Sequence, residues 1–265
     1  MQIEMPVRFY RAVPTSNPDG LVEENWTLDV AKTAFVELHC WNVGCPGGIP
    51  VPEQYWVFEG SPQNHEYMWR TVTEEIAPSL QAARAAGMPV VHVQGADIGA
   101  RYAHLQPPMP PAQPPQPCRE PISDHSTRRA NRVHGEGYAQ WSEWPNLDIA
   151  EPVKPIDGEV LVVTTEQFDD WLRTRGIDTL LYTGFSANLC ILDSPAAIKA
   201  MACLGYRCVI LREATTGVEF PETLEPRSHT LNALRYIEAW WGYSASTSDF
   251  RQACGISHSG RQVYK

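Results

Sequence analysis

The sequence predicts an α/β fold built on a parallel β-sheet. Short apolar runs rich in β-branched residues alternate along the chain with longer stretches of helical period, and this alternation is typical of βαβ units. Most of the runs are apolar throughout, as expected for strands covered on both faces. With 265 residues, 43% of them hydrophobic, the chain can bury one sizeable core. We therefore expect a single domain spanning 1–265.

Six segments are predicted as strands from their short apolar runs, the last of them the weakest. They are Thr33 to His39, Pro89 to Gln94, Glu159 to Val163, Thr179 to Gly184, Tyr206 to Leu211 and Tyr243 to Thr247. Four segments are predicted as helices because a glycine follows each of them directly, which is a common stop signal. They are Glu66 to Ala86, Glu166 to Arg175, Leu189 to Leu204 and His229 to Trp241.

Two regions fall outside this alternation. The N-terminal extension, 1–32, carries turn signals such as Asn17-Pro18-Asp19-Gly20. The insertion, 96–157, holds seven prolines between Pro107 and Pro117 and then a basic, histidine-bearing stretch. Loops this long inside a compact domain usually serve as lids, binding loops or partner arms. The alternative interpretation is a solvated spacer.

Composition narrows the class of partner. A formal net charge of -10 argues against binding to nucleic acid or to an anionic membrane, because both require positive patches. No signal peptide and no membrane-spanning apolar stretch is visible. Seven cysteines without framework spacing are typical of free thiols in a reducing compartment. We expect a cytoplasmic protein whose partner is a small-molecule substrate.

The segment 183–190, Thr-Gly-Phe-Ser-Ala-Asn-Leu-Cys, holds the strongest chemical signal. It places Cys190 at the first turn of a helix directly after a predicted strand. Unpaired N–H groups at a helix N-terminus favour thiolate over thiol and can hold an oxyanion. The alternative is that Cys190 is a small buried hydrophobe, the commoner role of cysteine.

The segment 184–190, the Ala-rich helix after it and the strand at 205–210 resemble the nucleophile region of the isochorismatase-like cysteine hydrolases. Supporting stretches are 175–180 and 32–36, and the similarity spans roughly residues 32–250. This family includes nicotinamidases, N-carbamoylsarcosine amidohydrolases and ureidoacrylate-type amidohydrolases. The resemblance implies a doubly wound, six-stranded parallel sheet in the order 3-2-1-4-5-6, with helices on both faces. Ligands then bind at the switch point between strands one and four, where His39 and Cys190 converge.

The sequence departs from the family at two of three catalytic positions. Where relatives carry a catalytic aspartate, this chain has His39, and where they carry a lysine it offers only Val163, Thr164 or Thr165. One hypothesis is a hydrolase that cleaves a C–N bond in a small amide, ureide or imide with a Cys190–His39 pair, oriented by Glu37. The other is a catalytically inactive or non-hydrolytic protein that binds a small molecule or acts in assembly.

The resemblance also implies contacts around the nucleophile. Relatives carry a non-proline cis peptide at the place of Phe185-Ser186, so Phe185, Ser186 and Ala187 are candidate substrate or oxyanion residues. Trp41 and Asn42 would line the pocket floor, and the Trp41 ring, where relatives often show glutamine, favours a flatter or more apolar substrate.

In the insertion, the segment 134–138 has the glycines of a lid hinge, which makes His134 and Tyr138 candidate substrate contacts. Metal binding is not expected, because the segment 92–98 lacks the Asp-x-His spacing of zinc-bearing relatives and His92 is interpreted as a core histidine. No cofactor is expected. Relatives are usually oligomers, so we expect a homo-oligomer.

Overall fold

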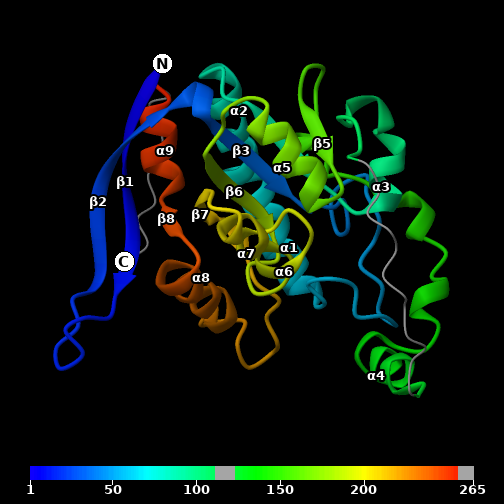
Figure 1. Cartoon of the computed structure of the whole chain (residues 1–265). Helices are drawn as coiled ribbons and strands as arrows, with labels where there is room; N and C mark the ends of the chain where they lie inside the picture. The colour runs from blue at the N-terminus through cyan, green and yellow to red at the C-terminus, as the bar shows by residue number, and fades with distance from the viewer. Residues whose placement is uncertain (111–122, 256–265) are drawn as a thin grey trace.

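The computed structural model describes residues 1–110 and 123–255. Its centre is an eight-stranded, mostly parallel sheet in the order β2-β1-β8-β7-β6-β3-β4-β5 (Figure 1). The strands are β1 Gln2–Arg11, β2 Gly20–Asp29, β3 Thr33–Leu38, β4 Val90–Val93, β5 Val160–Val162, β6 Thr179–Phe185, β7 Arg207–Thr216 and β8 Tyr243–Ala245. The predicted α/β class is confirmed.

The predicted six-stranded sheet and its order are wrong for the sheet as a whole, which has eight strands. From β3 onward the strands lie as β5-β4-β3-β6-β7-β8, with parallel pairing throughout. The two additional strands come from the N-terminal extension and pair antiparallel, β1 with β2 and with β8.

The N-terminal hairpin forms because one face of β1 is apolar. Ile3, Met5 and Val7 are buried, whereas Gln2 and Glu4 are exposed and Pro6 is half-buried. This period of two is the pattern of a strand that covers a core on one side. The hairpin therefore extends the sheet beyond β8, at the left of Figure 1.

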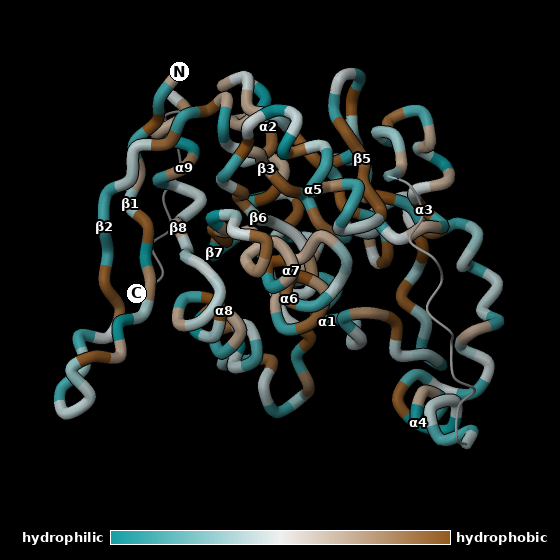
Figure 2. Tube along the Cα trace, in the orientation of Figure 1, coloured by the Kyte–Doolittle hydropathy of each residue, from teal (hydrophilic) through white to brown (hydrophobic). Residues whose placement is uncertain are grey.

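Helices cover both faces of the sheet. One core cluster joins the β1, α2 and α9 side, and a second joins α5, α7 and α8 to the opposite face; the hydrophobic colouring gathers along the central strands (Figure 2). Within 1–110 and 123–255, none of the helices is long and apolar enough to cross a membrane. The α-helices are α1 Pro62–Thr71, α2 Ala77–Ala85, α3 Ala96–Arg101, α4 His125–His134, α5 Thr165–Arg173, α6 Cys190–Asp193, α7 Ile198–Cys203, α8 Ser228–Trp240 and α9 Thr247–Ala253.

Shorter helical turns complete the elements. A π-helical turn at Val72–Ile76 joins α1 to α2, so that the predicted helix 66–86 lies within one continuous helical segment. The 3-10 turns are Val30–Lys32, Ala103–Leu105, Tyr138–Gln140, Trp144–Asn146 and Glu151–Val153.

The predicted helix Leu189 to Leu204 is wrong, because it is two short helices, α6 and α7. Pro195 lies between them, and a proline cannot donate a backbone hydrogen bond to the preceding turn. Ala196 follows with a φ of 60°, outside the helical region. The break shortens the helix that carries Cys190 to four residues.

The second half of the insertion packs against the loop 40–58, and residues 111–122, including most of the proline run, lie outside the described part of the chain. Ile149 bridges Trp41, and the Trp56 N–H donates to His134 O. The helix α4 stands away from the sheet, at the lower right of Figure 1, with residues 125–133 exposed. The stretch 138–153 thus packs against the loop 40–58, whereas α4 is exposed to solvent.

Candidate active site

The ends of β3 and β6 bring two loops together. Leu38 pairs with Gly184 in parallel register, and Gly184 has a φ of 109°. A Cβ on Gly184 would lie 1.9 Å from the Leu38 carbonyl oxygen, so only glycine allows the two strands to end this close. The turn beginning at His39 therefore lies beside the turn that leads to Cys190.

Cys190 lies half-buried at the start of α6. Burial, and secondly the negative charge of Glu59, raise the pKa of the Cys190 thiol, whereas the N–H groups of Ser186 and Cys190 hydrogen-bond the sulfur and oppose the rise. The expectation that a helix N-terminus lowers this pKa is wrong, because α6 has four residues and little dipole to offer. Without a base, Cys190 is a thiol at neutral pH.

The candidate oxyanion residues differ in what their N–H groups and side chains contact. The N–H groups of Ser186 and Cys190 both face the Cys190 sulfur. The Ala187 N–H instead donates to Thr216 O at 2.9 Å, which ties this turn to β7. The Phe185–Ser186 peptide is cis, as the resemblance implies. The Phe185 side chain is fully buried in the core and cannot contact a substrate.

His39 is buried in the turn that follows β3. Its side chain is 8% exposed, its ring stacks on Trp41 at a centroid distance of 4.7 Å, and its Nδ1 has no partner in the part of the chain that the structure describes. Burial lowers the pKa of His39 to about 4 against the opposing charge of Glu37. His39 is therefore a neutral imidazole at physiological pH.

The structure gives Glu37 a different role from the predicted one. Its Oε1 accepts the Cys40 N–H at 2.8 Å, and its Oε2 accepts a bond from His92 Nδ1 at 2.9 Å. Both oxygens are occupied, so Glu37 does not orient His39. It fixes the backbone turn that carries His39 instead.

Glu37 is one end of a buried chain of charges. His92 Nε2 lies 2.9 Å from Glu159 Oε2, and Arg84 contacts the same carboxylate at 2.7 Å. Burial disfavours a charged imidazole, but the hydrogen bonds to two carboxylates outweigh it and raise the pKa of His92. The interpretation of His92 as a satisfied core histidine is confirmed.

Glu59 is the functional candidate that sequence reasoning missed. It is fully buried at the end of the loop before α1, the Ser186 hydroxyl donates to its Oε1 at 2.5 Å, and its Oε2 has no partner among the described residues. Burial raises the pKa of Glu59 to about 7. The only sequence signal is a lone carboxylate after the apolar run Trp56-Val57-Phe58.

Aromatic rings from the two loops form one side of the site, which we call the aromatic wall: Trp41, Phe58, Tyr138 and Trp144. Successive ring centroids lie 3.8 Å apart for Trp41–Phe58, 5.8 Å for Phe58–Trp144 and 5.0 Å for Tyr138–Trp144. Burial, and secondly the charge of Glu59, raise the pKa of Tyr138 to about 12. The sequence-predicted Tyr138 therefore does lie near the buried carboxylate.

Two other predicted contacts hold the loops together. Asn42 donates through Nδ2 to Asn146 O at 3.2 Å and accepts the Asp148 N–H at 3.0 Å, so both ends of its amide are used. His134 stacks on Tyr138 at 4.4 Å and its Nδ1 lies 2.7 Å from Trp56 O. Asn42 and His134 thus link the two loops that carry the aromatic wall.

Thr164 and Thr165, two of the residues expected near the position of the family lysine, make hydrogen bonds, and Thr164 caps α5. The Thr164 hydroxyl accepts the Gln167 N–H, and the Thr165 hydroxyl accepts the Ala196 N–H. Neither lysine nor arginine is among the charges that shift the pKa of Cys190 or Glu59. In the part of the chain that the structure covers, no group of three or more His, Cys, Asp or Glu could hold a metal ion, and the six cysteines there are free.

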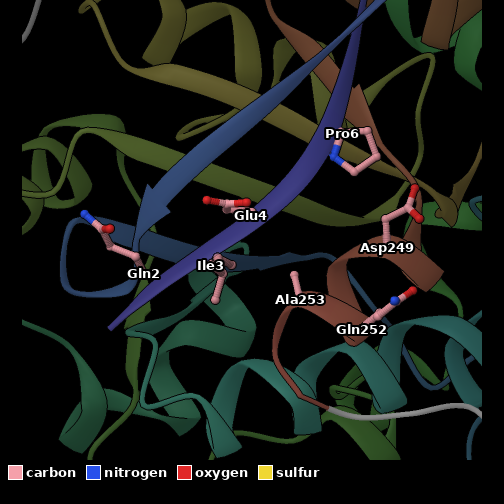
Figure 3. A pocket seen from close by; sticks show the side chains of 7 residues that line it. All are labelled: Gln2, Ile3, Glu4, Pro6, Asp249, Gln252 and Ala253. Atoms are coloured by element: carbon pink, nitrogen blue, oxygen red, sulfur yellow. The ribbon is translucent and has the colours of Figure 1, made fainter.

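Two surface hollows lie away from this site. The first, of about 420 Å³, is open to solvent between β1 and α9 (Figure 3). The second, of about 500 Å³, lies between the end of β1 and the end of α8. The first is lined by Gln2, Ile3, Glu4, Pro6, Asp249, Gln252 and Ala253. Cys190 lines neither hollow.

Comparisons with known proteins agree with this architecture. Ureidoacrylate amidohydrolase RutB of Caulobacter vibrioides is 28% identical over 195 residues, 69% of this chain and 77% of that protein. RutB of Stutzerimonas stutzeri is 29% identical over 192 residues, 69% of each chain. The crystal structure of a cysteine hydrolase from Pseudomonas syringae pv. phaseolicola covers 87% of this chain and 95% of its own, with a TM-score of 0.52 at 16% identity, which shows a shared fold. A model of the isochorismatase domain matches residues 54–240, and the chain therefore belongs to the isochorismatase family.

Proposed function

We propose that the protein is a cysteine-dependent hydrolase of a C–N bond in a small amide, ureide or imide, with Cys190 as the nucleophile. The observation that carries the proposal is the convergence of the Ser186 and Cys190 N–H groups on the Cys190 sulfur. Donors in this position can hold the negative oxygen that develops when a carbonyl is attacked. Family membership and the amidohydrolase relatives support the same reaction class.

In the proposed reaction, the Cys190 thiolate attacks the carbonyl carbon and the oxyanion is held by the two N–H groups. Collapse breaks the C–N bond, releases the amine and leaves an acyl group on sulfur as a thioester. Water then attacks the thioester, which frees the acid and restores Cys190.

The pKa values of Cys190 and His39 decide the role of His39 in this proposal. Burial raises the pKa of the Cys190 thiol and lowers the pKa of the His39 imidazole to about 4, so proton transfer from this thiol to this imidazole is strongly unfavourable. The expected Cys190–His39 pair is therefore a poor acid–base couple. We assign His39 a contact with the substrate instead, because its buried Nδ1 lacks a partner among the described residues and gains a hydrogen bond when a polar group binds.

The surroundings favour a neutral, flat substrate. The aromatic wall offers ring faces on which a planar amide or imide can stack. A carboxylate on the substrate would meet the charge of Glu59 without a lysine or arginine to balance it. We thus propose that neutral amides and ureides are better substrates than anionic ones, in contrast to the ureidoacrylate of the relatives' name.

The test measures ammonia release from primary amides and ureides, and ring opening of cyclic imides, by wild type and Cys190→Ala. The panel pairs each neutral compound with a carboxylate-bearing analogue. Cys203→Ala, which removes an exposed thiol, is the matched control and is expected to keep full activity. Turnover that survives Cys190→Ala would refute the proposal. A preference for the carboxylate analogues would refute its substrate class alone.

The alternative function is binding without hydrolysis. It is favoured by one observation, that His39 and Thr164 stand where relatives carry charged catalytic residues. Under this alternative, a panel compound binds wild type and Cys190→Ala with equal affinity and is not consumed by either. The homo-oligomer stays a prediction that light scattering tests.

A further inference from the structure

We infer that Glu59 is the general base and acid of this site, which takes the proton of the Cys190 thiol and returns it to the leaving nitrogen. The inference rests on the proposed function, because it assigns a catalytic group to that reaction. It introduces a carboxylate from the loop that joins β3 to α1, far in sequence from Cys190.

Ser186 joins the two groups. Its hydroxyl donates to Glu59 Oε1 at 2.5 Å, while its backbone N–H faces the Cys190 sulfur. A single residue therefore contacts both the carboxylate and the nucleophile. The negative charge of Glu59 also raises the pKa values of Cys190, Cys40 and Tyr138.

The loop holds Glu59 in place. Asn64 donates from Nδ2 to the Glu59 carbonyl at 2.9 Å, and the Gly60 N–H donates to Val57 O at 2.8 Å. A Cβ on Gly60 would lie 2.0 Å from the Trp56 ring, so the chain turns sharply directly after Glu59. The carboxylate is thereby positioned by backbone contacts, as a group that transfers protons needs to be.

The second carboxylate oxygen of Glu59, Oε2, indicates that this residue has a functional role. Oε2 is buried and has no hydrogen-bond partner among residues 1–110 and 123–255. A buried carboxylate oxygen left unpaired is costly to the fold, and glutamine would serve a purely structural site as well or better. The cost is explained if Oε2 accepts a proton from the thiol, from water or from a substrate amide during the reaction.

The pKa of Glu59 suits its action both as a base and as an acid. Burial brings the pKa of Glu59 to about 7, so the carboxylate and the carboxylic acid are both populated near neutrality, as an acid–base catalyst requires. In the first step the Cys190 S–H bond breaks, its proton moves to Glu59, and sulfur bonds the carbonyl carbon. In the second, Glu59 protonates the leaving nitrogen as the C–N bond breaks. In the third, Glu59 takes a proton from water, whose oxygen attacks the thioester, and the proton passes to the departing sulfur.

The experiment uses Glu59→Gln in the full-length protein with two readouts. The first is kcat against pH on the best panel substrate, which we expect to fall by about 10²- to 10⁴-fold. The second is alkylation of Cys190 by iodoacetamide against pH. Removal of the negative charge lowers the pKa of Cys190, so the alkylation profile is expected to move to lower pH. More thiolate with less turnover is a combination that a structural role does not produce.

Two further variants keep the inference testable. Ser186→Ala removes the hydrogen bond that stabilises the Glu59 carboxylate, so the acid limb of the kcat profile is expected to move to higher pH. Glu53→Gln changes an exposed carboxylate in the same loop and should behave as wild type. Ser186→Ala also substitutes for Glu59→Gln if thermal unfolding shows that the latter does not fold.

The outcomes separate the inference from the proposed function. If Cys190→Ala is inactive but Glu59→Gln turns over at the wild-type rate with an unmoved alkylation profile, the reaction stands and the role of Glu59 is overturned. If Cys190→Ala stays active, the proposed function fails and the inference fails with it. A reduced kcat with an unmoved alkylation profile would also overturn the inference, because Glu59 would then not act on Cys190.

Discussion

Substitution of Glu159 tests the buried chain that runs from Arg84 through His92 to Glu37. The Glu159 side chain is 7% exposed, and hydrogen bonds from His92 and Arg84 overcome burial and lower its pKa from 4.5 to about 2. A carboxyl with a lowered pKa in the folded protein stabilises it fully above pH 4.5, and this stabilisation is lost as the pH falls toward 2. The size of the shift corresponds to about 3 kcal/mol at pH 7 and about 2 kcal/mol at pH 3.5.

The assay is urea unfolding of Glu159→Gln and wild type at pH 7 and at pH 3.5. A glutamine side chain cannot ionise, so the variant is expected to be less stable by about 3 kcal/mol at pH 7 and by about 2 kcal/mol at pH 3.5. Glu222→Gln, which changes an exposed carboxylate, should stay within about 0.5 kcal/mol of wild type at both. A stability difference that does not shrink on acidification would refute the assignment of the charge to Glu159.

Three other substitutions follow from the loops. Gly184→Ala is expected to lower the free energy of unfolding by more than about 4 kcal/mol, measured by thermal unfolding, because its Cβ would meet the Leu38 carbonyl. Gly95→Ala, whose Cβ would lie in open space, should leave stability unchanged, and equal effects of the two variants would contradict the close approach of β3 and β6. Asn42→Ala removes two hydrogen bonds to the insertion and should speed amide exchange at 146–148 about tenfold or more, and unchanged exchange would show that Asn42 does not hold the loop. Trp41→Ala is expected to raise KM for planar substrates about tenfold with little change in kcat; a loss confined to kcat would remove the ring from substrate binding.

Local pattern was sufficient for the parallel part of the fold. The mostly apolar runs at 33–38 and 179–185 are the central strands β3 and β6, and every residue of both strands is buried. The N-terminal hairpin was missed although Ile3, Met5 and Val7 alternate with polar residues, because the turn signals that follow them are typical of an irregular extension. The break at Pro195 was equally visible, but the Ala-rich sequence around it favours a continuous helix.

The side-chain partners of the site could not be predicted from sequence. Glu37 has the right strand position to face His39, but its oxygens bind Cys40 and His92 because β4 brings His92 beside it. Glu59 carries no motif, and its importance comes from burial and from Ser186, 127 residues away. Such pairings depend on tertiary contacts that no local period encodes.

Hydrogen bonds join the two loops that form the aromatic wall to each other, whereas the turn before Cys190 is bonded to β7 through Ala187 and to Glu59 through Ser186. Trp41 and Phe58 come from one loop, Tyr138 and Trp144 from the other, and Cys190 follows β6. Under the proposed function, substitutions or length changes at the outer ends of these loops would alter which substrates the aromatic wall accepts. The backbone around Cys190 follows a buried strand of the sheet and would be less affected.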